Sequence, residues 1–349
     1  LGFTSLDDTV ATEKNGVFIL PLLYYTPDTR WAAGLAGVYY FKTQPKDSTE
    51  AESRMSYVQF LADYTQNKQS DVWSVWNIFT HNENYLLKGE LRFRNFPDRF
   101  YGIGNTTSKD NEERYSYNLV SVKNLFLKKI KPGWFAGIDY HFENEYGFQY
   151  TQGGLLENGS ITGYKGGIGS AFGLVSVLDT RDNVVNAHKG RLFELSSYFY
   201  RGYFGSTFNF TTLNGNYQEY WKLNKKKHVL AVQSKFRIAL GDVPFLDLST
   251  LGNDDLLRGY PKNRFRDNSF LGAQVEYRMP LFWRLGMVAF AGAGDVFDSP
   301  KDLGISNIKY SAGFGLRCVV NTAERLNIRF DYAIGHEGGY FYFMVAESF

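Results

Sequence analysis

Residues 241–267 read GDVPFLDLSTLGNDDLLRGYPKNRFRD and lie between two segments in which apolar and polar residues alternate. A connection of this length is usually either functional or disordered. This one is not low in complexity, because aliphatic, aromatic and charged residues of both signs are mixed along it. At its centre stands Leu256-Leu257-Arg258-Gly259-Tyr260, an arginine followed by a glycine and an aromatic residue. The composition therefore predicts that the loop packs against the rest of the molecule.

The segments around this loop have the two-residue period of a β-strand. In 326–333, one face is apolar and the other is mainly polar; the faces are Leu326, Ile328, Phe330 and Tyr332 against Asn327, Arg329, Asp331 and Ala333. Such runs recur and predict about 16 antiparallel strands, an even number as in single-chain outer-membrane barrels. The predicted strands are 17–26, 31–42, 53–67, 71–81, 84–96, 113–127, 132–146, 161–178, 190–201, 207–222, 228–240, 268–279, 284–296, 307–320, 324–334 and 340–349.

A soluble β-sandwich would show the same alternation with its apolar face turned inward. Two features favour a membrane barrel instead. The predicted strands are longer than the roughly 5–6 residues typical of globular proteins. Aromatic residues also gather at strand ends, as in the girdles of membrane barrels; examples are Tyr39-Tyr40-Phe41 and Tyr340-Phe341-Tyr342-Phe343. The expected fold class is all-β, a transmembrane β-barrel of about 16 antiparallel strands. Its long loop, 241–267, is expected to fold into the lumen and to be held there by Arg258.

Composition limits the functions that the chain can have. The formal net charge is +2, and the one basic cluster, Lys225-Lys226-Lys227, is most simply a turn, so no nucleic-acid partner is expected. Cys318 is the single cysteine and the 5 histidines are far apart, so neither an internal disulfide nor a metal site is expected. No serine, histidine and acid stand in a catalytic pattern, and we expect neither enzymatic activity nor a cofactor. The longest apolar run, 17–25, is far short of the ~20 residues of a membrane helix.

Connection lengths predict a barrel with two different ends. If both chain termini lie at one end, four long connections fall at the other; they are 97–112, 147–160, 241–267 and 297–306. The first end then has mostly short turns, although 43–52 and 179–189 are longer. Long loops outside and short turns in the periplasm are typical of outer-membrane barrels. The expected organisation is a short periplasmic segment, 1–16, followed by the barrel, 17–349.

Several motifs, taken in order, resemble the barrel of the outer-membrane protein 85 superfamily, also called bacterial surface antigen proteins. Leu257-Arg258-Gly259-Tyr260 is similar to the tip of that family's sixth extracellular loop. The two strands after the loop also resemble the family; they are Gly272-Ala-Gln-Val-Glu276-Tyr277-Arg278 and Phe290-Ala-Gly292-Ala-Gly294-Asp295-Val-Phe297. The resemblance runs from about residue 17 to the end and is strongest in 254–297. It implies a bacterial outer-membrane location.

The resemblance implies that Arg258 locks the loop inside the lumen against Glu276 and Phe290. Strand parity places Glu276 on the polar face with Gln274 and Arg278, and an arginine can bind a carboxylate through two parallel hydrogen bonds. Family members often carry an aspartate where this chain has Gly292. Either Glu276 therefore holds Arg258 alone, or Asp295 takes the second place. The alternative is a solvated extracellular loop with an ordinary Arg-Gly turn.

Two further segments resemble family features. Asp179-Thr-Arg181-Asp182-Asn183, with Gly190 after it, is similar to a motif at a periplasmic turn, and is either a functional contact or a turn rich in Asp and Asn. The chain ends in Phe349, as do many outer-membrane barrels, and this residue could complete an insertion signal with Phe341 and Phe343. Glu347, in the same register, does not fit such a signal.

The resemblance implies that the chain inserts or translocates other proteins through a labile seam between its first and last strands. Pro21 lacks a backbone donor, which fits an edge strand, and Tyr24, Phe341 and Phe343 would flank the seam. Partners would be outer-membrane lipid, an unfolded outer-membrane or secreted protein, and a second copy or a periplasmic protein. Family translocases also have POTRA domains before the barrel, where this chain has 16 residues. A passive pore or a scaffold barrel is the alternative.

Overall fold

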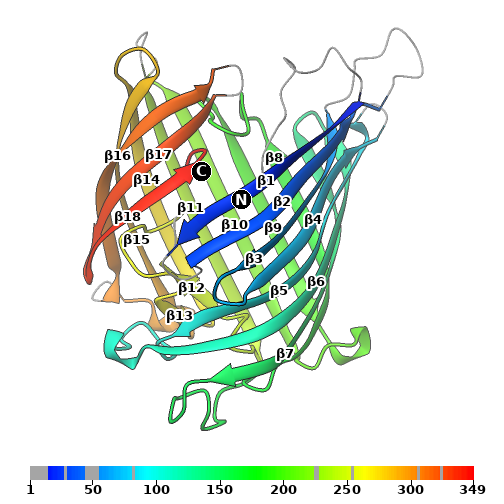
Figure 1. The fold of residues 1–349 in the computed structure, drawn as a ribbon, viewed down its shortest axis with the longest axis vertical. Coiled ribbons are helices and arrows are strands. Elements are labelled where there is room, and N and C mark those ends of the chain that lie inside the picture. Colours follow the sequence, from blue (N-terminus) through cyan, green and yellow to red (C-terminus); the bar gives the residue numbers. More distant parts are fainter. Residues whose placement is uncertain are drawn as a thin grey trace.

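The fold is taken from a computed structural model of the chain, which describes residues 15–26, 30–43, 55–80, 83–223, 228–252, 255–304, 307–322 and 325–349. Most of the expected periplasmic segment, 1–14, lies outside these ranges, as does Lys225 to Lys227. The described residues form a 16-stranded antiparallel sheet that curls into a barrel (Figure 1). The all-β barrel prediction is confirmed.

Each strand pairs with its neighbour in sequence, and β14 follows β11 directly in the sheet. The first eight strands are β1 (Asn15–Thr26), β2 (Arg30–Phe41), β3 (Ser56–Thr65), β4 (Ser70–Phe79), β5 (Tyr85–Phe100), β6 (Glu113–Lys131), β7 (Trp134–Tyr150) and β8 (Gly167–Asp179). The other eight are β9 (Gly190–Tyr200), β10 (Phe210–Lys222), β11 (Val229–Gly241), β14 (Ser269–Pro280), β15 (Leu285–Phe297), β16 (Lys309–Asn321), β17 (Leu326–Gly335) and β18 (Gly338–Val345).

Several predicted strand boundaries were wrong. The strands predicted to end at 96, 127 and 146 continue to Phe100, Lys131 and Tyr150. Residues 161–166 form turns rather than strand, and β8 begins at Gly167. The last strand was predicted to continue to residue 349, but β18 ends at Val345 because Ala346 has a positive φ of 70°. That left-handed conformation turns the remaining residues away from the direction of the strand.

The two faces of the sheet differ as the alternation predicts. On the outer face, apolar side chains such as Leu271, Phe314 and Phe330 are exposed. On the inner face, polar side chains such as Gln274 and Glu276 are buried. An apolar exterior around a polar interior is the pattern of a barrel that sits in lipid. No helix in the described part of the chain has the length and apolar character to cross a membrane.

The wall of the barrel is of unequal height. Strands β1 to β4 have 10–12 residues, whereas β5, β6 and β7 have 16, 19 and 17. Ser70 begins β4 opposite Asn95, and β5 continues beyond this point to Phe100. The extra length therefore lies at the end with the long connections. At this end, the wall beside β1 is lower than the wall formed by β5 to β7.

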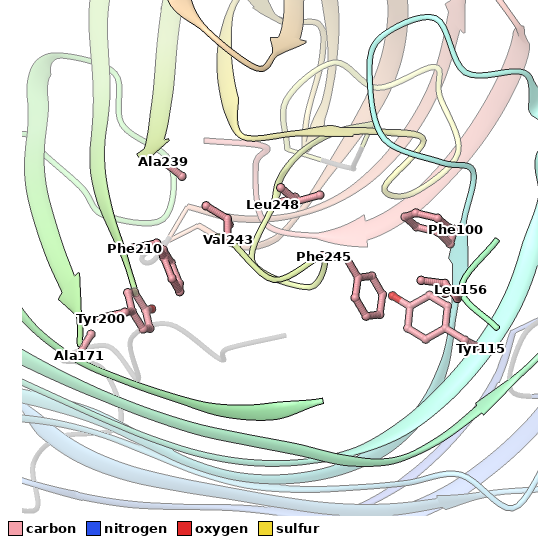
Figure 2. Packing of buried hydrophobic residues seen from close by; sticks show 10 residues of the cluster. All are labelled: Phe100, Tyr115, Leu156, Ala171, Tyr200, Phe210, Ala239, Val243, Phe245 and Leu248. Atoms are coloured by element: carbon pink, nitrogen blue, oxygen red, sulfur yellow. The ribbon is translucent and has the colours of Figure 1, made fainter. Parts of the chain in front are cut away.

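The lumen is filled by the long connection between β11 and β14, residues 242–268, which we call the luminal loop. It contains a small hairpin of β12 (Ser249–Leu251) and β13 (Phe265–Asp267). Phe245 of this loop packs edge-on against Phe100 and Tyr115 of the wall, with ring centroids 5.8 and 5.4 Å apart (Figure 2). A second apolar cluster surrounds the loop tip and includes Leu256, Leu257 and Tyr260. The principal core thus lies between the loop and the inner wall.

Candidate functional site

Arg258 occupies a fully buried position at the tip of the luminal loop. Its guanidinium binds Glu276 of β14 through Nη2 and Asp331 of β17 through Nη1, the latter at 2.6 Å. The guanidinium carbon also lies 3.5 Å from the centroid of the Phe290 ring on β15, which is close enough for a cation–π contact. All three charged side chains have an exposed fraction of 0%. One arginine therefore links three strands of the wall to the loop.

The second carboxylate at Arg258 is Asp331, and the proposal that Asp295 could take this place was wrong. Asp295 instead accepts hydrogen bonds from the Asn105 amide, at 3.1 Å, and from the backbone N–H of Val296. Gly292 lies opposite Gln274 in the β14–β15 ladder. Asp331 reaches Arg258 because the intervening strand β16 has glycine at the facing position Gly315, which leaves space on the inner wall.

The residues after Arg258 attach the loop tip to the last hairpin of the barrel. The backbone N–H of Gly259 donates to the hydroxyl of Tyr342 on β18, at 2.8 Å. The hydroxyl of Tyr260 donates to the carbonyl of Tyr310 and accepts from the N–H of His336, between β17 and β18. Gly259 has a φ of 110°, a region that favours glycine. The Leu-Arg-Gly-Tyr motif therefore contacts both β17 and β18 from inside.

Two more buried arginines anchor the other part of the loop. Arg264 binds both carboxylate oxygens of Glu337, at 2.7 and 2.6 Å, in the turn that precedes β18. Arg266 donates to the backbone carbonyls of Arg99 and Phe245. The first contact holds the C-terminal side of the barrel and the second holds the N-terminal side. The loop thus joins opposite parts of the wall across the lumen.

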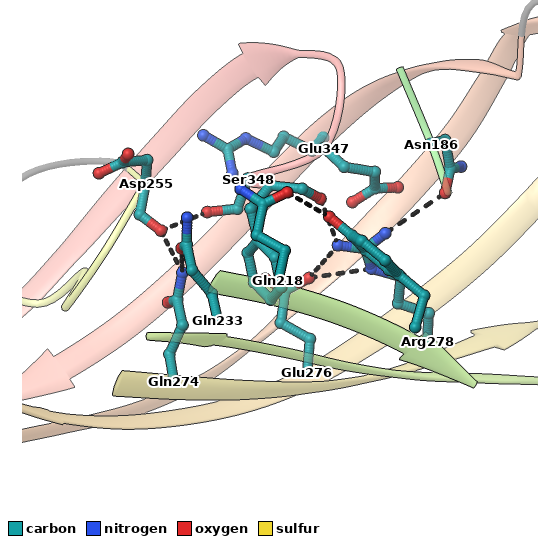
Figure 3. Close-up of polar contacts among 12 residues, drawn as sticks. Asn186, Gln218, Gln233, Asp255, Gln274, Glu276, Arg278, Glu347 and Ser348 are labelled. Atoms are coloured by element: carbon teal, nitrogen blue, oxygen red, sulfur yellow. Dashed lines mark hydrogen bonds and ion pairs between the residues drawn. The ribbon is translucent and has the colours of Figure 1, made fainter. Parts of the chain in front are cut away.

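The last residues of the chain turn into the lumen (Figure 3). Glu347 binds Arg317 at 2.8 Å, and the hydroxyl of Ser348 donates to the carbonyl of Asp255 in the luminal loop. The carbonyl of Phe349 accepts from Arg278, whose guanidinium also lies 5.2 Å from the Phe349 ring. Phe349 therefore does not continue the outward set of Phe341 and Phe343, and its part in an insertion signal stays a prediction. A charged Glu347 is stabilised by an arginine in the lumen, whereas lipid would leave it unpaired.

The turn from Asp179 to Gly190 is organised by its own acidic side chains. Asp179 binds Arg181 through both carboxylate oxygens, at 3.0 and 2.9 Å. Asp182 accepts the backbone N–H groups of residues 188 and 189, and binds Arg325 of the β16–β17 turn at 2.9 Å. Gly190 has a φ of 97°. The motif therefore shapes this turn and ties it to another turn at the same end of the barrel.

The Asp182–Arg325 contact predicts a pH dependence. Burial acts to raise the pKa of Asp182, but hydrogen bonds from Arg325 and from two backbone N–H groups hold it below its usual range. Such a carboxylate stabilises the folded state at pH values above its pKa in the unfolded chain, which is about 3.9. The stabilisation is lost as the pH falls through the lower pKa of the folded state.

We therefore expect wild type to be more stable than Asp182→Asn at pH 7, and the difference to shrink below about pH 4. Denaturant titrations of both proteins between pH 3 and pH 7 measure this difference. The exposed Asp242, replaced with Asn, is the matched control. A difference between wild type and Asp182→Asn that is constant across this range would contradict the assignment.

The order of paired strands begins at β1 and ends at β18, which makes these strands the two edges of the sheet. They lie on the same side of the barrel (Figure 1). We call the boundary between them the seam. Pro21 lies in β1 opposite Leu35, and Tyr24 pairs with Ala32 through the backbone. Phe341 and Phe343 of β18 are 69% and 70% exposed on the outer face.

Neither edge strand carries a charged side chain, and in β2, the neighbour of β1, the only charged residue is Arg30 at its start. On β1, residues 17–20 alternate between the two faces, and all four side chains are exposed; they are Val17, Phe18, Ile19 and Leu20. On β18, residues 340–344 have no charged side chain; they are Tyr340, Phe341, Tyr342, Phe343 and Met344. Charged side chains first enter the inner face at Asp331 of β17 and Asp63 of β3. The seam is therefore an apolar strip in a wall that is otherwise polar inside.

Comparison with known families identifies the chain. The family model described as Omp85 superfamily domain matches residues 162–349, which include the Asp179 turn, the luminal loop and β18. The chain belongs to the Omp85 superfamily. The resemblance drawn from the sequence motifs is therefore confirmed. Membership also places this Omp85 barrel, with its long extracellular loop, in the bacterial outer membrane. The Asp179 turn lies at the opposite end of the barrel, and its role as a periplasmic contact stays a prediction.

Solved structures show the same fold. BamA from Haemophilus ducreyi lacking POTRA domains 1-3 matches with a TM-score of 0.60 and 12% identity, over 96% of this chain and 70% of that one. CdiB from Acinetobacter baumannii matches with a TM-score of 0.59 and 9% identity, over 96% of this chain and 60% of that one. At such identities the likeness concerns the fold alone. A comparison with curated proteins found no match.

Several site residues of this Omp85 barrel were not predicted. Asp331 had been placed on the polar face of its strand, but nothing local relates that strand to Arg258. Arg264 and Arg266 flank Phe265 in the same loop, and their charge in a segment expected to be buried was a usable signal for ion pairs. Arg317 and Glu347 are 30 residues apart and meet only because the chain turns inward after β18.

Proposed function

We propose that this Omp85 barrel takes part in the assembly or transport of outer-membrane or secreted proteins, by way of the seam between β1 and β18. The observation that carries the proposal is that these two strands are the edges of the sheet. A strand edge has backbone donors and acceptors that can pair with an incoming strand. The resemblance to family insertases and translocases supports the same role. The partner is an unfolded protein, and the proposed role is not enzymatic.

The luminal loop would control this seam because it holds β18 from inside at both of its ends. Just before the start of β18, Arg264 binds Glu337, and at the middle of the strand Gly259 binds Tyr342. Beyond its other end, Ser348 binds the carbonyl of Asp255. An edge strand that is paired on one side depends on such contacts for its position. Loosening the loop is therefore expected to loosen β18.

Liposome insertion tests the proposal directly. The purified chain is reconstituted, and the folding of an unfolded test barrel is followed by protease protection and gel migration. We expect the chain to accelerate insertion, and a disulfide between β1 and β18 to abolish the acceleration. Cys318 is first replaced with Ser, because it is the single cysteine and would compete for oxidation. The same cysteine pair under reducing conditions is the matched control.

Failure of the chain to accelerate insertion, with or without the disulfide, would overturn the proposal unless a partner protein restores the activity. A second copy of the chain or a periplasmic protein could supply the capture of substrate, and cross-linking in the native membrane would detect either. A passive pore is the second candidate, because a cavity of about 1150 Å³ remains beside the luminal loop. Steady conductance in planar bilayers without insertion activity would favour the pore. Silence in both assays would favour a scaffold.

A further inference from the structure

The cavity beside the luminal loop lies at the extracellular end and extends to the seam. Its walls come from the β3–β4 turn, from β5 and β6, from the loop tip and from the first residues of β18. Its volume is about 1150 Å³, which is large enough for the headgroup of a lipid. The cavity shares Tyr260 and Tyr342 with the loop-tip contacts, but Arg258, Glu276 and Asp331 do not line it.

The cavity has an excess of positive charge. The cations are Lys68, Arg94, Arg99, Lys109, Arg114 and Lys262, and the carboxylates are Asp98 and Glu112. Both carboxylates already face arginines: Glu112 lies 3.6 Å from Arg99 and 4.0 Å from Arg114, and Asp98 lies 3.9 Å from Arg266. The lysines are exposed and come from three separate segments. The cavity is therefore complementary to an anion.

The cavity reaches the free edge of β18. Phe341 and Tyr342 both line it, although Phe341 is on the outer face and Tyr342 binds the loop tip inside. Because β18 is an edge strand of the sheet, the cavity borders the seam. Lys109 brings a cation to this edge, because its Nζ lies 3.3 Å from the hydroxyl of Tyr340.

The seam strands beside this cavity carry no charged side chain, so acyl chains can lie along them without facing charged groups. The wall is also low at β1 to β4, where β5 continues above the β3–β4 turn that carries Lys68. A polar, cationic cavity thus lies beside an apolar strip that faces lipid. This combination fits an anionic amphiphile. The anionic headgroup would occupy the cationic cavity, and the acyl chains would lie along the apolar strip.

We propose that the cavity binds the phosphate-bearing headgroup of a membrane lipid whose acyl chains lie in the seam between β1 and β18. The phosphate would lie among Lys68, Lys109 and Lys262, and the chains would pass the edge of β18 beside Phe341. Two sources share this chemistry, an anionic phospholipid and a phosphorylated outer-leaflet glycolipid. The inference does not depend on the insertion activity, since binding is measured on the resting barrel.

Native mass spectrometry of the full chain in a zwitterionic detergent tests the proposal. The probes are dimyristoyl phosphatidylglycerol, dimyristoyl phosphatidylcholine and lipid A, with glycerol 3-phosphate as the headgroup without chains. Because three lysines attract an anionic headgroup, an anionic probe should bind at least about tenfold more tightly than phosphatidylcholine. Whether phosphatidylglycerol or lipid A binds more tightly identifies the source.

The triple variant Lys68→Gln, Lys109→Gln and Lys262→Gln should lose this preference. The matched control removes the same charge from exposed lysines elsewhere, Lys165→Gln, Lys189→Gln and Lys301→Gln, and should keep it. Heat-dependent gel migration verifies that each variant is folded. Equal affinity for anionic and zwitterionic lipids, or equal loss in both variants, would overturn the proposal. The proposal would also be overturned if glycerol 3-phosphate bound with the same affinity as the lipid, because the site would then recognise a soluble anion.

Discussion

Replacing Arg258 with Ala is expected to lower the free energy of unfolding by about 3–5 kcal/mol. The change removes the cation shared by Glu276 and Asp331, whose side chains are fully buried. Each carboxylate keeps one other arginine, Arg278 at Glu276 and Arg317 at Asp331. Each nevertheless loses a fully buried charge-assisted hydrogen bond, which costs more than the loss of an exposed ion pair. Urea titration in detergent micelles, followed by tryptophan fluorescence, measures the effect.

The geometry around Arg258 makes the prediction specific to arginine. Lys carries the same charge but has a single ammonium group, so it cannot bind both carboxylates through separate nitrogens and stack on Phe290. Arg258→Lys should therefore recover only part of the lost stability. Adding Asp331→Asn to Arg258→Ala should not restore stability, because Asp331 still binds Arg317 and its loss would remove that buried ion pair.

A matched control is Arg114→Ala, because the Arg114 side chain is 72% exposed and lies 4.0 Å from Glu112. A change of no more than about 0.5 kcal/mol is expected there. Should Arg258→Ala unfold at the same urea concentration as wild type, the luminal site would not stabilise the barrel.

Replacing Gly259 with Ala is expected to displace the loop tip and to cost about 2–3 kcal/mol. The residue has a φ of 110°, and an added Cβ would lie 2.7 Å from the backbone nitrogen of Gly335 and 2.8 Å from the backbone carbon of Ile334. These are main-chain atoms of β17 and its end, so they cannot rotate away as a side chain could. The hydrogen bond from Gly259 to Tyr342 of β18 would be lost with this displacement.

The variant Gly205→Ala separates the cost of the positive φ from the cost of the close approach to β17. Gly205 has a φ of 90°, but a Cβ there would meet nothing within 4 Å. Its substitution should cost about 1 kcal/mol, from backbone conformation alone. Limited tryptic cleavage after the exposed Lys262 should be faster in Gly259→Ala than in wild type. Equal cleavage rates and equal losses of stability in the two glycine variants would show that the close approach to β17 does not matter.

The sequence by itself determined the strand architecture of this Omp85 barrel. A two-residue period is a local property, since successive side chains in a strand point to opposite faces. Apolar residues such as Leu326 and Phe330 therefore marked the outer face, and Asn327 and Asp331 the inner one, without any knowledge of neighbours. Long connections were equally visible, because they break this period. These local signals were sufficient for the 16-stranded sheet.

The interactions inside the lumen were decided by the tertiary structure. Which carboxylate reaches Arg258 depends on the relative shift of β14, β15, β16 and β17, and a period along one strand does not determine that shift. Asp331 was therefore visible as an inner residue but not as a partner. The inward turn after β18 likewise depends on Arg317 and Arg278, which offer buried charge to Glu347 and to Phe349. Alternation is encoded within each strand, whereas charge pairing across the lumen exists only once the sheet has curled and the loop has entered it.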